Sequence, residues 1–280
     1  MKQFLKILIP IAVTIFFTQP TFGYGPKGYE PSKHQKNHDG KSRGGEGRHG
    51  YGLPKGPPAD IPAHIKERMS PDGKGINLNG SQIGVTGISI MAETPALKNV
   101  VSMALKGNNL GDEGVRVITQ SSTFKNLEFL SLWDNGISPE GIKMLARGAN
   151  FNKLKELNLM QNNVGDQGVV LLVDSSNLSN LTSLDLSVNK IGDKGAIAIA
   201  TSPYLSNLKK LDLFNNQISL KGLRAILQSK TLVSLKEIDF VKNNVDDESA
   251  AKLWESHMNS CRTLKKSSNS KKIKLPLCAN

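Results

Sequence analysis

Few residues of this sequence have the types and spacing that catalysis or metal binding requires. His34, His38 and His49 lie in a segment rich in Gly, Pro and Lys, and the first two have i, i+4 spacing. On a flexible chain, this arrangement is compatible with weak adventitious metal binding or with no role at all. The stretch 45–50 matches G-x-G-x-x-G, but no strand pattern precedes it and no helix pattern follows it. We therefore assign no phosphate site, no metal site and no cofactor.

Catalytic motifs are absent from the sequence as well. It contains no H-E-x-x-H, no phosphate loop, no G-x-S-x-G elbow and no Cys/His pair with a catalytic spacing. Residues 76–256 contain no histidine. The sequence therefore predicts a protein that is not an enzyme.

Cys261 and Cys278 are the only cysteines. In an oxidising compartment they could pair, and the bond would close a loop of 18 residues, worth about 3 kcal/mol in chain entropy. The sequence around them predicts no fixed geometry, so the pairing stays an open possibility.

The rest of the sequence is organised by a unit of 27 residues that recurs without insertion. One copy, at residues 154–168, has the form L-x-x-L-x-L-x-x-N-x-V-G-D-x-G. Its asparagine belongs to a column with Ser81 at the start, followed by Asn108, Asn135, Asn162, Asn189, Asn216 and Asn243. An amide at this position can bond backbone groups of the turn and of neighbouring repeats. The period predicts a solenoid.

Each unit predicts one strand, one turn and one helix. The leucine pair before the asparagine, as in Leu157 and Leu159, alternates at period two, which is typical of a short strand with one buried face. Helix N-cap residues follow, and then acids such as Asp166 that suit the helix dipole. Next comes a glycine column, which we attribute to a close approach of helix and strand. Apolar residues at i, i+3 and i+4 give each helix one buried stripe.

This pattern resembles leucine-rich repeats over residues 76–260, and its G-D-x-G helix start resembles the ribonuclease-inhibitor-like subfamily. The resemblance implies an α/β fold: a right-handed solenoid with a parallel concave sheet and convex helices. It also implies protein binding as the usual role. The end repeats depart from the pattern at Gly73, Ser81 and Ser249, as expected of caps.

The chain divides into four segments. Residues 1–23 are predicted to be a signal peptide, because two lysines precede an apolar run of about 11 residues, which is too short to span a bilayer. Residues 24–75 are a predicted disordered linker, ending in a short capping helix around Ile61, Ile65 and Met69. Residues 76–260 hold seven repeats, closed by a last helix with Leu253, Trp254 and Met258, and residues 261–280 form a basic tail.

The net positive charge is confined to the segments outside the repeats. Residues 76–260 carry 18 basic and 18 acidic side chains, so the net charge of +12 belongs to the other segments. The tail holds six basic residues and no acid. Any attraction to anionic polymer or lipid therefore belongs to the ends. The tail lacks aromatic residues among its lysines, so no specific nucleic-acid binding is indicated.

The candidate binding surface is the concave side of the predicted sheet, which carries the strand residues that alternate with the buried leucines. Two groups of side chains stand out there. The apolar group is Phe129, Trp133, Met160, Phe214 and Val241, and the acidic group is Asp185, Asp212 and Asp239. The apolar group is read either as a contact patch or as scattered surface hydrophobes. The acidic group is read either as a solvated row relieved by Lys210 or as a ligand site.

Two functions are compatible with these features. The first is an exported protein, periplasmic or secreted and of bacterial type, that binds an unidentified protein on its concave sheet. The second is an envelope-associated protein that its basic ends hold to an anionic polymer or lipid, with the solenoid as a spacer. Salt separates them, because attraction through flexible basic ends is screened more strongly than apolar contact.

Overall fold

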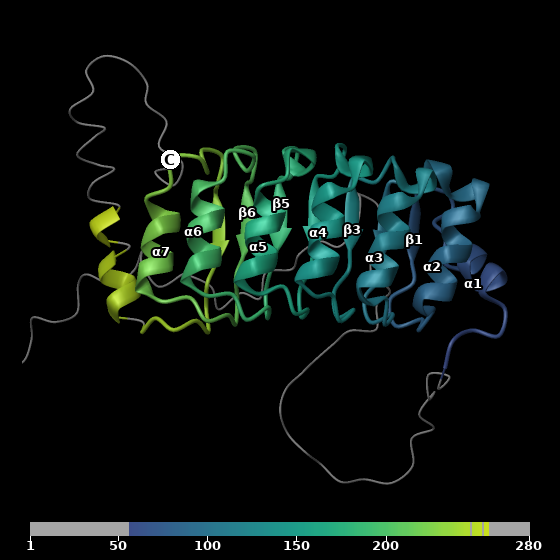
Figure 1. The fold of residues 1–280 in the computed structure, drawn as a ribbon, viewed down its shortest axis with the longest axis horizontal. Coiled ribbons are helices and arrows are strands. Elements are labelled where there is room, and N and C mark those ends of the chain that lie inside the picture. The colour runs from purple at the N-terminus through teal and green to yellow at the C-terminus, as the bar shows by residue number, and fades with distance from the viewer. Residues whose placement is uncertain (1–55, 247, 254, 258–280) are drawn as a thin grey trace, which may run out of the picture. The chain divides into compact units, whose positions relative to one another are not determined.

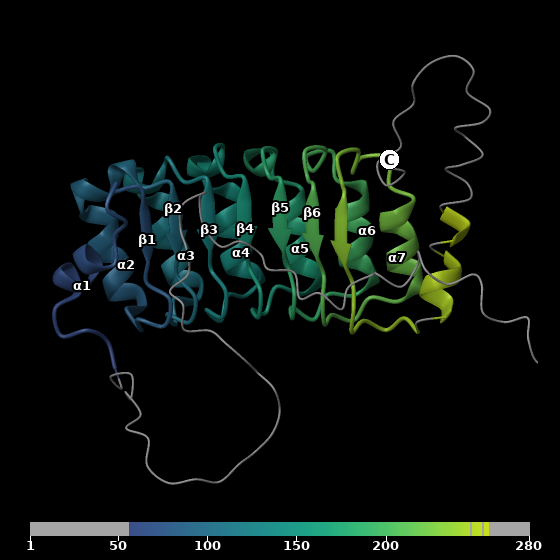
Figure 2. The same ribbon diagram turned by 180° about the vertical axis from the view of Figure 1, so that it is seen from behind.

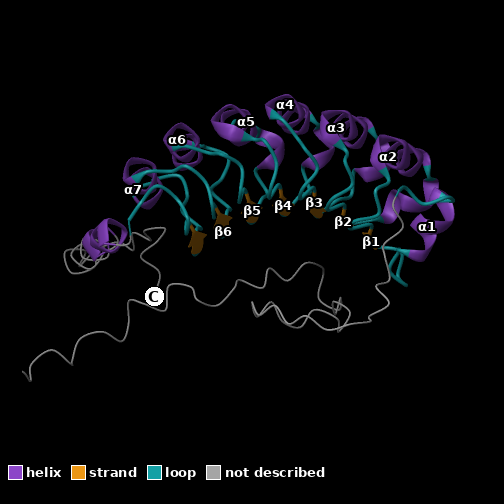
Figure 3. Ribbon diagram, turned by 90° about the horizontal axis from the view of Figure 1, so that it is seen from below, coloured by secondary structure: helices purple, strands orange, loops and turns teal. Residues whose placement is uncertain are grey.

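The protein folds into a single parallel sheet backed by one layer of helices (Figure 1). The structure is a computed structural model, and it describes residues 56–246, 248–253 and 255–257. All of these residues belong to one compact unit. Figure 3 shows the strands along the inner side of an arc and the helices along its outer side. The predicted parallel sheet with convex helices is confirmed.

Each strand is three residues long, and the strands follow one another in the order of the sequence. They are β1 (Gly75–Asn77), β2 (Ser102–Ala104), β3 (Phe129–Ser131), β4 (Glu156–Asn158), β5 (Ser183–Asp185), β6 (Lys210–Asp212) and β7 (Glu237–Asp239). Every residue pairs with its counterpart one period later, as Leu130 does with Leu157. The register is the one that the repeat predicts.

A helix follows each of the first six strands. The α-helices are α1 (Ile61–Glu67), α2 (Gly84–Glu93), α3 (Gly111–Gln120), α4 (Pro139–Arg147), α5 (Gly165–Val173), α6 (Asp193–Thr201) and α7 (Leu220–Leu227). Short 3₁₀ turns lead into the next strands at η1 (Pro95–Asn99), η2 (Ser122–Phe124), η3 (Ala149–Phe151) and η4 (Ser176–Leu178). Beyond β7, residues 248–253 and 255–257 are also helical.

The core lies between the two layers. Each repeat contributes leucine pairs such as Leu130 and Leu132, together with a large residue from the turn before the strand, such as Phe124 or Phe151. These four side chains have no exposed surface. A single repeat could not bury such residues on both sides, so neighbouring repeats have to cover one another.

The asparagine column joins each repeat to the one before it. The side-chain oxygen of Asn162 accepts hydrogen bonds from the backbone N–H of Asn135 (3.1 Å) and of Ile137 (3.0 Å). Its Nδ2 donates to the backbone oxygens of Leu132 (3.0 Å) and Leu159 (2.9 Å). The same pattern, in which the side chain both accepts hydrogen bonds from the preceding repeat and donates to it, recurs at Asn135, Asn189 and Asn216. The predicted role of this column is confirmed.

The aspartates at the starts of α3, α5 and α6 form hydrogen bonds to the next repeat. Asp193 Oδ1 accepts from the backbone N–H of Ser219 (2.8 Å) and of Gly222 (3.0 Å). A β-carbon added at Gly222 would lie 2.6 Å from this carboxylate and 2.7 Å from the side chain of Ile218. Our explanation of the glycine column was therefore wrong. In every repeat that has this glycine the residue four positions earlier crowds it, and at Gly141, Gly195 and Gly222 the previous repeat's aspartate does so as well, whereas no strand residue is among these nearest neighbours.

Helix α1 lies at the N-terminal end of the core. Asp60 caps the helix by accepting from Ala63 N (2.9 Å), and Ile65 is only 4% exposed in the core. The chain then turns back so that Met69 pairs antiparallel with Ile76 of β1.

The C-terminal end is described in part. Leu253 packs on the core, whereas Trp254 and Met258 lie outside the described residues. The predicted signal peptide, most of the linker, Cys261, Cys278 and the basic tail lie outside them too. None of the described helices has the length and apolar character needed to cross a membrane.

The asparagine ladder can be tested with Asn162→Ala. The substitution leaves the N–H groups of Asn135 and Ile137 buried without their acceptor, so we expect the free energy of unfolding to fall by about 3 kcal/mol. Urea unfolding measures this change. The control is Asn152→Ala, at an exposed position, where we expect a change within about 0.5 kcal/mol. Equal stability of the two variants would contradict the role given to the ladder.

Candidate functional site

The concave side of the sheet is the candidate surface, and Figure 2 views the molecule from the strand side. In each strand the central residue points into the core, so the first and last residues face the other way. The chain just beyond each strand adds a further side chain to this face, which is how Trp133, Met160, Phe214 and Val241 reach it. The strand positions are fixed by the sheet register, so the surface is held rigidly.

Two aromatic rings on this surface are each covered by a lysine. Lys106 Nζ lies 3.4 Å from the centre of the Trp133 ring, and Lys242 Nζ lies 5.1 Å from the centre of the Phe214 ring. Trp133 Nε1 also donates a hydrogen bond to Gln161 Oε1 (3.4 Å). Both rings are partly exposed. The surface therefore presents aromatic groups with cations already on their faces, a contact worth about 0.5–1 kcal/mol at exposed sites.

The predicted apolar patch is divided in the structure. Phe129 begins β3 and Trp133 lies four residues later, which is about 13 Å along an extended chain. The two side chains are therefore not neighbours, and the sequence-based interpretation that placed them together was wrong. Ser187, which is 2% exposed, interrupts the column between Met160 and Phe214. What results is one group at Trp133 and Met160 and another at Phe214 and Val241, which is 44% exposed.

The acidic row also differs from its predicted solvated state. Asp185 is 3% exposed and Asp212 is 6% exposed, whereas Asp239 is partly exposed. Lys210 does not relieve the row through a direct ion pair of its own, because its Nζ pairs with Glu237 Oε2 at 2.9 Å. The row is instead held by hydrogen bonds within the sheet surface.

Those hydrogen bonds centre on Ser187. Its Oγ lies 2.6 Å from Asp185 Oδ1 and 2.6 Å from Asp212 Oδ1. Asp185 Oδ1 accepts from Ser187 N (2.9 Å), and its Oδ2 accepts from Asn158 Nδ2 (3.0 Å). Asp212 Oδ1 accepts from Phe214 N (2.9 Å).

Burial changes the acidity of both carboxyl groups. Burial raises the pKa of Asp212 to about 6, and the negative charges of Asp185 and Asp239 act in the same direction. The pKa of Asp185 is raised by burial too, while the hydroxyl and N–H of Ser187 oppose the change. A carboxyl group that titrates near pH 6 can change charge within the physiological range.

Sequence reasoning missed the residues that surround these groups. Lys106, Gln161 and Lys242 cover or bond the aromatic rings, and Ser187 and Asn158 hold the carboxylates. Gln161 and Lys242 both stand immediately before an asparagine of the ladder, with φ of 55° and 58°. The same position holds a glycine, Asp134, Val188 or Asn215 in the other repeats, so the sequence offered no column signal for Gln161 and Lys242.

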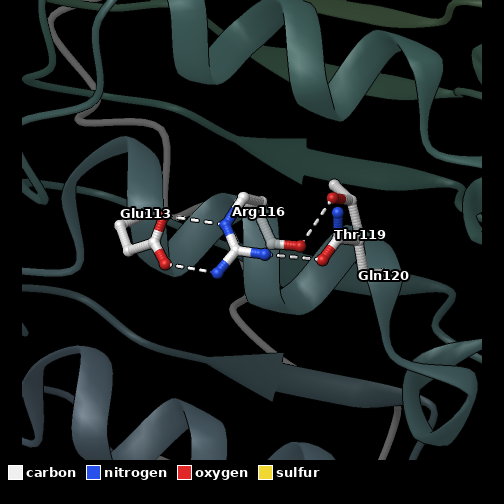
Figure 4. Close-up of polar contacts among 4 residues, drawn as sticks. All are labelled: Glu113, Arg116, Thr119 and Gln120. Carbon is white, nitrogen blue, oxygen red and sulfur yellow. Dashed lines mark hydrogen bonds and ion pairs between the residues drawn. The ribbon is translucent and has the colours of Figure 1, made fainter.

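The opposite face differs in character. On α3, Arg116 pairs with Glu113 and donates to Gln120 Oε1 at 2.7 Å, while Thr119 Oγ1 donates to the backbone oxygen of Arg116 (Figure 4). Lys143 and Glu140 form a similar pair on α4. Such exposed pairs within one helix are typical of a solvated surface and contribute little.

Comparison with known proteins agrees with this architecture. A family model described as "Leucine Rich repeat" matches residues 97–118, 125–146, 152–173, 177–200 and 204–227, which are successive strand-and-helix units of the solenoid. The chain is a leucine-rich-repeat protein. Repeats of this family are typical of protein-interaction modules.

The chain is also similar to proteins of known structure. Internalin C2 from Listeria monocytogenes is 22% identical, with a TM-score of 0.42 over 64% of this chain and 76% of that one. Leiomodin-1 actin-binding site 2 is 16% identical, with a TM-score of 0.30 over 45% of this chain and 93% of that one. A search of curated proteins found no match.

The buried row makes a pH-dependent prediction for the leucine-rich-repeat domain. The pKa of Asp212 is about 6 in the folded protein and returns to the ordinary value of 3.8 in the unfolded chain. Folded Asp212 therefore holds its proton more tightly than unfolded Asp212 does. The contribution of this group to stability is therefore lost as pH rises from about 4 to about 6, by up to about 3 kcal/mol.

Asp212→Asn removes the charge and keeps the shape of the side chain. By urea unfolding, we expect the variant to match the parent near pH 4 and to be the more stable of the two at pH 7.5. If the stability difference between the two proteins were the same at both pH values, the burial of this carboxylate would not be costing stability.

Proposed function

We propose that this leucine-rich-repeat protein binds another protein on its concave sheet. The observation that carries the proposal is the set of partly exposed aromatic side chains on that face, Trp133 and Phe214, beside Met160 and the exposed Val241. Aromatic side chains bury a large area at low entropic cost, and they dominate the energy of many protein interfaces. The helical face offers short ion pairs instead.

The rigidity of the surface supports the same proposal. The strands that carry these residues are locked by the sheet and by the asparagine ladder. A partner can therefore bind without ordering the receptor first, which lowers the entropic cost of association. The lysines over the rings would move aside or contribute cationic contacts to the partner.

We place the protein outside the cytoplasm, exported to a periplasm or secreted. This part of the proposal rests on the charged and apolar pattern of residues 1–23. The second candidate function is attachment to an anionic polymer or lipid through the basic residues outside the repeats. Its support is that residues 76–260 have no net charge while residues 261–280 carry six basic side chains.

The two functions respond differently to salt. Binding through the basic tail should weaken steeply between low and physiological ionic strength, because exposed charges are screened over about 8 Å at 0.15 M. Binding through the aromatic groups of the concave sheet should change little.

The concave-sheet function is tested by Trp133→Ala. This substitution removes a large contact side chain without touching the core leucines, so we expect affinity for the partner to fall by about 2 kcal/mol or more, roughly 30-fold. The partner is first identified by cross-linking in the native host followed by mass spectrometry, and affinity is then measured by titration calorimetry.

Lys221→Ala is the matched control, because Lys221 is exposed on α7. It should change neither affinity nor stability. Equal affinity of Trp133→Ala and the parent would reject the concave-sheet function. A loss of stability that accompanies the loss of affinity would assign Trp133 a structural role instead.

A further inference from the structure

One hydroxyl group on the concave surface serves two carboxylates. Ser187 Oγ lies 2.6 Å from an oxygen of Asp185 on β5 and 2.6 Å from an oxygen of Asp212 on β6. All three side chains are less than 7% exposed. A serine hydroxyl carries one hydrogen, so it can donate to only one of these oxygens at a time. The second contact requires a hydrogen from elsewhere.

The other donors show which carboxyl group supplies that hydrogen. Besides the hydroxyl, Asp185 accepts from the backbone N–H of Ser187 and from the amide of Asn158. Asp212 accepts from the backbone N–H of Phe214. Hydrogen bonds donated to a carboxylate stabilise its ionised form. Asp185 is therefore the better anion, and Asp212 is the better site for a proton.

We propose that Asp212, Ser187 and Asp185 form a proton-dependent clasp between strands β6 and β5. In the closed clasp, the protonated carboxyl group of Asp212 donates to Ser187 Oγ, and the Ser187 hydroxyl donates to the ionised carboxylate of Asp185. When Asp212 loses its proton to solvent, the hydroxyl has one hydrogen for two anions. The contact to Asp212 then becomes repulsive and opens, and the concave surface gains one negative charge.

The charged groups around the clasp do not offset the negative charge that Asp212 acquires when it loses its proton. Glu156 lies on β4, and Asp239 on β7 adds a negative charge beside Asp212. Lys210 on β6 is paired with Glu237 on β7, and Lys242 lies over Phe214. Beneath the sheet, Leu184 and Leu211 belong to the apolar core. Among the described residues, no cation forms an ion pair with either carboxylate of the clasp.

The raised pKa of Asp212 agrees with this arrangement. Burial and the charge of Asp185 raise the pKa of Asp212 to about 6. The clasp would therefore close below that pH and open above it, in a range where ordinary aspartates are fully ionised. It stands independently of the proposed partner binding, because it needs only the residues of this chain.

The clasp is tested by carbon-13 NMR of the aspartate carboxyl carbons in the full chain, titrated from about pH 4 to pH 8. We expect the Asp212 signal to titrate near pH 6. The Asp185 signal should move with the same midpoint, because Ser187 links the two groups. In Asp212→Asn this step should vanish from the Asp185 signal, because the amide donates to Ser187 at every pH.

Two further variants separate the clasp from simple burial. In Ser187→Ala, Asp212 should still titrate above its ordinary range, but the step in the Asp185 signal should become several-fold smaller, because only the direct effect of the Asp212 charge remains. In the control Asp239→Asn, the midpoint should fall, because a neighbouring negative charge is lost, and the two signals should stay coupled. The clasp is overturned if no carboxyl group titrates above about pH 5. It is equally overturned if the Asp185 step is as large in Ser187→Ala as in the parent, or if Asp185 does not follow Asp212 in the parent.

Discussion

The structure depends on the asparagine that follows each of the strands β2 to β7 by four residues. Its carbonyl oxygen accepts from two backbone N–H groups of the preceding repeat, and its amide returns a hydrogen bond to that repeat's strand, as Asn162 does with Ile137 and Leu132. An unpaired buried N–H costs about 1–3 kcal/mol, so no internal repeat is complete without its successor.

Much of the fold could be predicted because its causes are local and repeated. Leucine alternation gives the strands, the asparagine column gives the turns, and Ile65 in an isolated apolar pattern marks the N-terminal cap. The glycine column was harder to interpret, because the neighbour that crowds Gly222 is Asp193 of the previous repeat. Such contacts between repeats depend on side-chain direction, which periodicity alone does not supply.

The sequence could indicate which residues form the candidate surface, but not how exposed each of their side chains is. Strand alternation in the sequence assigns Trp133, Phe214 and the aspartates to the concave side. Whether such a residue is solvated depends on its neighbours across the sheet: Ser187 is small enough to let Asp185 and Asp212 come together and become buried. A rigid ladder thus supports a surface with two aromatic groups and, between them, a pair of carboxylates that is costly to ionise. Proteins tolerate such costs most often where a surface has a function.

The central claim is that the partner lies on the concave sheet of this leucine-rich-repeat protein. The most direct measurement uses two variants of this chain. One carries a photo-reactive amino acid in place of Val241 on the concave side, and the other carries it in place of Val170 on α5. These two valines are matched, being 44% and 48% exposed. After irradiation in the native host, the account predicts that the partner is captured from position 241 and not from position 170. Capture from position 170 alone, or equally from both, would contradict it.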